Sequence, residues 1–207
     1  MSTLVFDSGE ELPAAQIAQI RHRAAYVETL VGCLEDAPRL EPELYGSYDD
    51  WYLQALEDGL FRRVFVVEVR EWRRHVEDLL RDQLTRNGVD SAWWDGLCEA
   101  PAASGDGEVE RLRRGLAEGL GLELPGALWR DLEELVAVAR TIAEGTRVAR
   151  AVLQRRYESY FSDLDAFGDG DPGGRLTLNA EHARRAFAAV EAFWAALPYR
   201  VVGEGVA

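Results

Sequence analysis

Two arginine-rich strings hold the side chains of this chain that are best suited to act on an anion. In the first, residues 139–156 carry five arginines and one glutamate, a local net charge of +4 in a chain whose formal net charge is −14. Guanidinium groups bind phosphate and carboxylate oxygens through paired N–H donors. Arg140, Arg147 and Arg150 are therefore our candidate binding residues for an anion such as RNA. The alternative is that this string is one solvated helix face.

The second string is REWRRH, residues 70–75, which ends in the candidate acid–base residue His75. Histidine titrates near neutral pH and serves most often as a general acid or base. On a helix, residues five apart point about 140° apart around the axis, so Arg70 and His75 would not share a face within one protomer. The alternative to a catalytic role is a surface charge ladder beside Trp72.

Patterns for metal, nucleophile and nucleotide sites are incomplete. The segment that begins at Asp163 resembles a calcium-binding loop, but Gly174 stands where a bidentate glutamate closes such a loop. No two of the three histidines have zinc-ligand spacing on a helix, and the chain has no GxSxG, Walker loop or GxGxxG after a strand. We therefore expect no metal and no nucleotide cofactor.

The elements that must position these residues are helices. Apolar residues recur at helical spacing through most of the chain, which predicts an all-α, single-domain bundle of about six to eight helices. Gly59 is expected to weaken or bend one helix and Gly145 to interrupt another, while Leu176–Leu178 is the only strand candidate. An acidic helical segment at 1–59 and a bundle at 60–207 would form one continuous domain. The predicted helices span residues 13–36, 48–59, 60–86, 92–99, 109–120, 126–157 and 180–197. Ser91 and Asn179 are the predicted N-caps of the helices that follow them. The predicted buried face of the 60–86 helix comprises Phe61, Phe65, Val69, Trp72, Val76, Leu79 and Leu80.

Composition predicts a cytoplasmic protein. The N-terminus has no signal-peptide pattern, and no apolar run approaches the roughly 18 residues of a membrane span. The two cysteines have no CxxC spacing, which suits a reducing compartment. All 23 basic residues are arginines, and the net charge of −14 opposes nonspecific binding to nucleic acid or to an anionic membrane.

The order of features over residues 60–197 points to a family. A long apolar helix is followed by a short Trp-bearing segment, a short helix that ends in GLGLEL, and a helix that opens with Trp129 and carries Arg140 eleven residues later. A Gly-rich stretch, the string LTLN (176–179) and an Ala- and aromatic-rich helix complete the order. This order resembles the HEPN superfamily, in particular prokaryotic HEPN-like proteins of toxin–antitoxin and anti-phage defence systems.

The resemblance implies a metal-independent ribonuclease that acts as a homodimer, with arginine and histidine of an R-N-x-x-x-H motif from both protomers in one groove. Arg140 matches the motif arginine, but Thr141 stands where asparagine is usual and Gly145 where the histidine belongs. A glycine cannot move a proton. The resemblance therefore predicts a catalytically degenerate module that has kept an anion-contacting arginine.

Three functions remain open at this point. The first is a HEPN-like binding module of a toxin–antitoxin or defence system, with a second protein, a homodimer partner or RNA bound to it. The second is an active metal-independent endoribonuclease that uses Arg140 at a dimer groove, with His75 or Glu144 of a second protomer as the base. The third is an unrelated all-α regulatory or protein-binding domain. The first two require Trp129 to be buried and Arg140 to line a groove near a two-fold axis.

Overall fold

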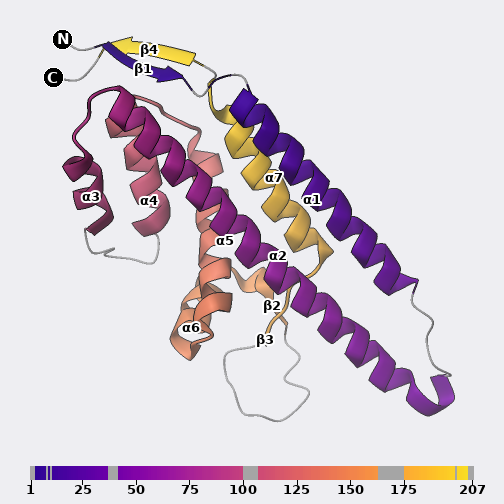
Figure 1. Ribbon diagram of the computed structural model, residues 1–207. Coiled ribbons are helices and arrows are strands. Elements are labelled where there is room, and N and C mark those ends of the chain that lie inside the picture. Colours follow the sequence, from indigo (N-terminus) through magenta and orange to yellow (C-terminus); the bar gives the residue numbers. More distant parts are fainter. Residues whose placement is uncertain are drawn as a thin grey trace.

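The computed structural model describes residues 3–7, 9, 11–36, 42–99, 107–162, 175–198 and 200–204. These residues form an all-α helical bundle with two short antiparallel ribbons of two strands each, which confirms the predicted fold class (Figure 1). The helices are α1 (Glu11–Glu35), α2 (Pro42–Arg86), α3 (Ser91–Glu99), α4 (Gly107–Arg114), α5 (Gly126–Glu144), α6 (Arg147–Arg156) and α7 (Ala180–Ala196). The strands are β1 (Thr3–Asp7), β2 (Phe161–Ser162), β3 (Arg175–Leu176) and β4 (Arg200–Glu204).

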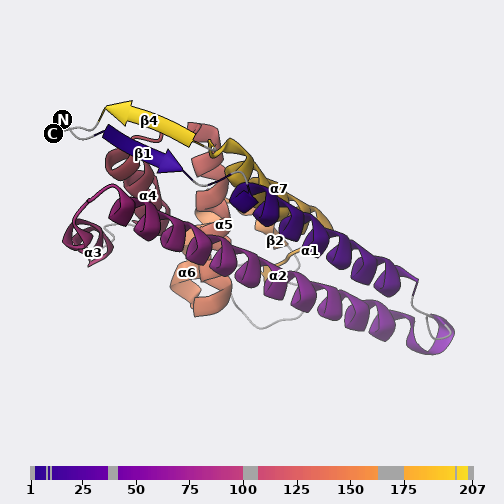
Figure 2. The same ribbon diagram turned by 45° about the horizontal axis from the view of Figure 1, so that its top comes forward.

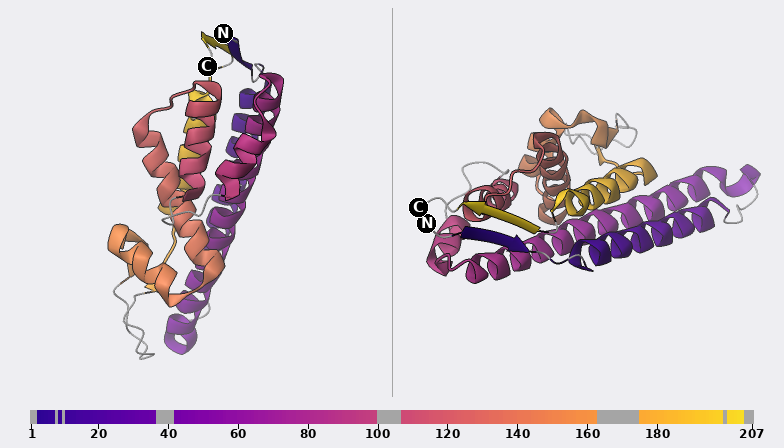
Figure 3. Two further views of the ribbon diagram at one scale, coloured as in Figure 1. Left: turned by 90° about the vertical axis from the view of Figure 1, so that its left-hand side faces the viewer. Right: turned by 90° about the horizontal axis from the view of Figure 1, so that it is seen from above.

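Helix α2 is one long continuous helix, so the prediction of two helices that meet at Gly59 was wrong. The helix runs unbroken for 45 residues, so the predicted segment boundary between residues 59 and 60 falls inside it. A single glycine costs a helix only about 1 kcal/mol relative to alanine, which tertiary packing on both sides outweighs. The first half of α2, with α1 beside it, extends beyond α5 and α7 (Figure 3).

The core lies where α1, α2 and α5 meet α7. Phe193 of α7 makes edge-to-face contacts with Trp72 of α2, Trp129 of α5 and its neighbour Trp194, at centroid distances of 5.4, 6.0 and 5.4 Å. All four rings are buried, as expected for aromatic residues at helical spacing. The predicted buried face of α2 is also confirmed, and it comprises Phe61, Phe65, Val69, Trp72, Val76, Leu79 and Leu80.

Local signals set most of the helix ends. Gly145 interrupts the 126–157 pattern as predicted, because it ends α5 in the left-handed conformation at φ 61°. Thr146 then caps α6 by accepting a hydrogen bond from Ala149 N at 3.2 Å. The predicted cap at Asn179 is confirmed as one half of a capping box with His182. Helix α3 is capped by Asp90, whose Oδ1 accepts from Ala92 N, and the prediction of Ser91 was one residue off.

Two glycines allow the end of α4 to pack closely on its neighbours. Helix α4 continues into a π-helical turn at Gly115–Gly119. A Cβ atom at residue 115 would lie 2.6 Å from Cζ3 of Trp94, and one at Gly119 would lie 2.6 Å from Cδ2 of Leu84. Because van der Waals contact requires more than 3 Å, only glycine fits at either position without movement of a neighbour.

The strands tie segments far apart in the sequence to α2. Strands β1 and β4 pair antiparallel at one end of the bundle, which the sequence analysis did not predict (Figure 2). The side-chain amide of Gln83 fastens this ribbon to α2, because it accepts from Asp7 N at 3.0 Å and donates to Asp7 O at 2.9 Å. Strand β3 covers only the start of the predicted strand at 176–178 and pairs with β2. The calcium-loop-like segment 163–174 lies outside the described residues.

Candidate functional site: an arginine groove

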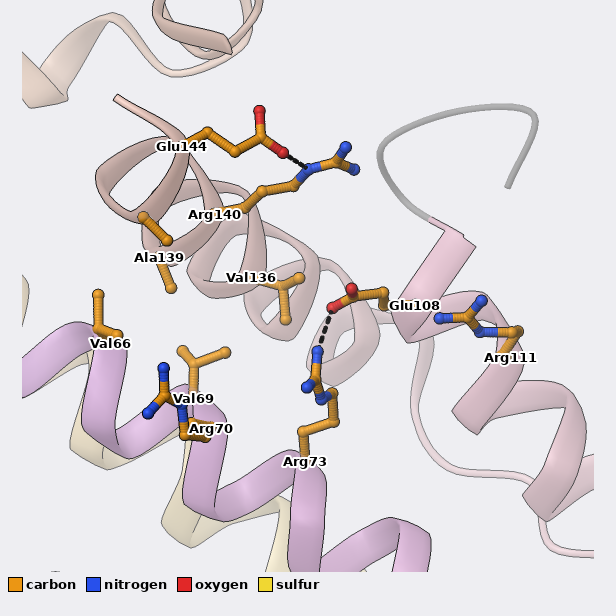
Figure 4. Close-up of a pocket in the computed structure, with 11 residues that line it drawn as sticks. Val66, Val69, Arg70, Arg73, Glu108, Arg111, Val136, Ala139, Arg140 and Glu144 are labelled. Carbon is orange, nitrogen blue, oxygen red and sulfur yellow. Dashed lines mark hydrogen bonds and ion pairs between the residues drawn. The ribbon is translucent and has the colours of Figure 1, made fainter. Parts of the chain in front are cut away.

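Helices α2, α4 and α5 enclose a groove with a cavity volume of about 460 Å³ (Figure 4). Four arginines stand around it, two from α2, one from α4 and one from α5, and apolar side chains of α2 and α5 lie between them. We call this site the arginine groove. Its arginines are Arg70, Arg73, Arg111 and Arg140, its carboxylates are Glu108 and Glu144, and its apolar residues are Val66, Val69, Val136, Ala139 and Ala143.

Helical spacing explains why these residues share a site. On α5 the lining positions 136, 139, 140, 143 and 144 follow the three-and-four spacing of one helix face, and positions 66, 69, 70 and 73 do the same on α2. The two faces oppose each other across the groove (Figure 4). Val69, Val136 and Ala139 are buried between the helices, while the side chain of Arg140 keeps an exposed fraction of 47%. The apolar floor therefore belongs to the core, and the guanidinium groups remain in contact with water.

Two of the four arginines have carboxylate partners. Arg140 Nε lies 2.5 Å from Glu144 Oε1, and Arg73 Nη1 lies 3.0 Å from Glu108 Oε2. The hydrogen bond from Arg140 to Glu144 raises the pKa of the guanidinium, and the negative charges of Glu144 and then of Glu108 raise it further. Both glutamates therefore act on the charge of Arg140. Each pair is half-exposed, so an incoming anion can compete for the arginine.

The other two arginines have no carboxylate partner in the groove. Arg111 Nη1 donates to the carbonyl oxygen of Cys98 at 3.1 Å. Arg70 is exposed, and among the described residues its guanidinium has neither an ion-pair nor a hydrogen-bond partner. Four guanidinium groups against two carboxylates leave the described lining with a net charge of +2, in a chain of −14. The site is thus a local positive potential on an acidic molecule.

Of the predicted site residues, Arg140 is among the described residues that line the groove, and Arg150 and His75 are not. Arg140 lines the groove and Trp129 is buried, which are two of the features that both HEPN-based hypotheses require. Arg147 and Arg150 belong to α6, beyond the turn at Gly145. Arg150 is not among the described residues that line the groove, and the side chain of Arg147 is outside the described part.

His75 lies on α2 outside the described groove lining, where its Nε2 is 3.4 Å from the Arg74 guanidinium. Sequence reasoning missed three of the four groove arginines. Arg70 and Arg73 were considered only as part of the string that ends in His75, and Arg111 was not considered. Arg70 and Arg73 share one face of α2 with Val66 and Val69, and this spacing was the signal that could have pointed to the two arginines.

The chemistry that these groups support is anion binding. No histidine occurs among the described lining residues, and Glu144, the acid nearest to Arg140, is already engaged by that arginine. Across the described part of the chain, no three His, Cys, Asp or Glu side chains gather as metal ligands would. The same part holds no helix with the length and apolar character of a membrane span.

A second cavity, of about 320 Å³, lies between α5 and α7. Beside it is a cluster of polar side chains that are hydrogen-bonded or paired with one another. Glu134 accepts a hydrogen bond from the hydroxyl of Tyr160 at 2.7 Å and pairs with Arg185 at 2.9 Å. Burial, followed by the bond to Glu134, raises the pKa of Tyr160. His182 stacks on the Tyr160 ring at 4.3 Å. Because these groups satisfy one another, we assign this cluster to the packing of α5 against α7.

Comparison with known proteins yields no relative: no protein-family model, no curated protein and no solved structure matches this chain.

Proposed function

We propose that this protein is a HEPN-like helical module that binds RNA in the arginine groove without cleaving it. The observation that carries the proposal is the convergence of four guanidinium groups from three helices on one groove, in a chain that is otherwise strongly acidic. Arginine presents a planar fork of donors that matches phosphate oxygens. The apolar floor between the arginines gives a base or sugar a surface on which to pack.

The HEPN resemblance supports the same site, because Arg140 is the residue that matches the motif arginine of that family. It also extends the proposal to a role in a prokaryotic toxin–antitoxin or anti-phage defence system and to a homodimer. The missing motif histidine and the lack of any histidine among the described lining residues favour binding over catalysis.

An alternative function is a metal-independent endoribonuclease, and one observation favours it. The carboxylate of Glu144 stands beside Arg140, where a base would be needed to accept a proton from the 2′-hydroxyl of RNA. The ion pair with Arg140 occupies this carboxylate, which argues for the binding function. The two functions are separated by a cleavage assay in the presence of EDTA.

The test measures binding and cleavage of one 5′-phosphorylated single-stranded RNA, labelled at its 3′ end. Arg140→Ala should weaken binding by roughly tenfold or more, as expected for the loss of a charge-assisted hydrogen bond. Arg63→Ala, which alters an exposed arginine of α2 outside the described groove lining, is the control and should change the affinity less than threefold. No cleavage is expected from any of the proteins.

Two results would overturn the proposal. If Arg140→Ala binds RNA as tightly as wild type, the groove is not the RNA site, and the unrelated regulatory domain becomes the better hypothesis. If wild type cleaves RNA with EDTA present while Glu144→Gln does not, the protein is the ribonuclease of the alternative, with Glu144 as its base.

A further inference from the structure

The charge of the arginine groove matches one particular kind of phosphate. Its four arginines and two glutamates give the described lining a net charge of +2. A phosphate monoester carries about −1.5 to −2 at pH 7, whereas each internal phosphodiester of a nucleic acid carries a single charge. A single terminal phosphate therefore neutralises the net charge of the groove. An internal diester leaves about half of the net charge of the groove without a counterpart.

The groove has room for about one nucleotide. Its volume of about 460 Å³ lies within the roughly 300–1,000 Å³ range of sites that hold one small molecule. Proteins that bind an extended single strand use a longer basic track with a series of stacking positions. The groove therefore has room for one phosphate with its sugar and base.

The rest of the molecule disfavours an extended polyanion. The chain has a formal charge of −14, so the part outside the groove carries −14 minus +2, which is −16. Nucleotides of a longer strand that extend beyond the groove would lie over this acidic surface. At ionic strengths near 0.1 M, where charges interact over about 10 Å, the surface repels their phosphates. The arginines of α6 are an exception to this acidic average.

The groove has arginines on both of its walls. Arg70 and Arg73 come from α2, and Arg140 comes from α5 on the other side of the groove, where its guanidinium is turned toward Glu144 (Figure 4). Arg70 is the guanidinium that no described residue engages, whereas Arg140 pairs with Glu144, and Arg73 pairs with Glu108 and also with Glu77. Val69 and Val136 lie between the two walls and offer the base or sugar an apolar surface.

From charge, volume and placement together, we infer that the groove selects the terminal phosphate monoester of a nucleotide. This ligand can be the phosphorylated end of an RNA chain or a free nucleoside monophosphate, which share the same chemistry. The inference rests on the proposed RNA-binding function and narrows its ligand. Arg70 is the residue on which the selectivity depends most.

The experiment compares one ten-nucleotide RNA in three forms, with a 5′-phosphate, with a 3′-phosphate and with hydroxyls at both ends. At least one phosphorylated form should bind roughly tenfold or more tightly than the unphosphorylated form. Arg70→Ala should abolish this difference, and the control Arg63→Ala should preserve it. Competition by adenosine monophosphate assigns the site to free nucleotides as well, whereas its failure to compete assigns the site to RNA ends.

The outcomes separate the inference from the function on which it rests. If all three RNA forms bind equally and Arg70→Ala weakens them equally, the groove binds RNA and the selectivity for a terminal phosphate is refuted. If Arg70→Ala and Arg140→Ala change the binding of none of the three forms, the proposed function itself fails.

Discussion

At the scale of the residue, the four arginines of the groove differ in what already holds them. Glu144 engages Arg140 and Glu108 engages Arg73, while Arg111 is directed to a carbonyl oxygen. Arg70 is without a partner among the described residues. A ligand therefore meets one available guanidinium first and must compete for two others. This order makes Arg70 and the two glutamates the residues that set affinity.

His182 provides a residue-scale prediction about stability. Burial, and then the charge of Arg185, hold the pKa of His182 below its ordinary value. Its Nδ1 accepts a hydrogen bond from Asn179 N at 3.3 Å, which a protonated ring cannot do. Because the unfolded chain binds this proton more readily than the folded protein, the free energy of unfolding should fall as the pH drops below about 6.5.

The substitution His182→Gln tests this prediction, because glutamine can complete the same capping box and does not titrate. Urea unfolding at pH 7.5 and pH 5.5 should show a smaller acid-induced loss of stability in the variant than in wild type. His22→Gln, at an exposed position of α1, is the matched control and should behave as wild type does. Equal losses in wild type and His182→Gln would contradict the assignment.

At the scale of the element, the features that could be predicted from the sequence are those that depend on residues close together in the chain. The glycine stop at Gly145, the cap at Asn179 and the buried face of α2 depend on residues within one or two turns, and all three are confirmed. The β1–β4 ribbon was missed because it pairs Thr3 with Glu204 across almost the whole chain. The helix break at Gly59 was predicted from propensity alone, and propensity is a weak guide where packing decides.

Alanine substitutions at two glycines inside the helices should change the free energy of unfolding in opposite directions. A Cβ atom at Gly59 would meet nothing within 4 Å, so Gly59→Ala should raise the free energy of unfolding by about 1 kcal/mol. Gly115→Ala places its Cβ 2.6 Å from the Trp94 ring, and this substitution should lower the free energy of unfolding by about 1–3 kcal/mol. Urea denaturation of both variants measures this, and a loss of stability in Gly59→Ala would show that α2 needs flexibility there.

At the scale of the whole molecule, the proposed function rests on a contrast in charge between the groove and the rest of the chain. The sequence showed that the chain is acidic and that Arg140 is a candidate, but the groove could not be predicted from it. Its arginines come from α2, α4 and α5, and Arg111 is 29 residues from Arg140 in the sequence (140 − 111 = 29). Only the packing of three helices places them around one cavity. Arg150, Arg155 and Arg156 of the same basic string belong to α6 and are not among the described residues that line the groove.

The measurement that tests this account most directly is the affinity of Glu144→Gln and Arg70→Ala for one 5′-phosphorylated RNA. Glu144→Gln releases Arg140 from its ion pair and should tighten binding severalfold, while Arg70→Ala should weaken it by roughly tenfold or more. Glu118→Gln is the control, because Glu118 pairs with Arg114 at the same i,i+4 spacing outside the described groove lining. Opposite shifts, with the control unchanged, are the predicted result. Unchanged affinity in both groove variants, or weaker binding in both, would contradict the account.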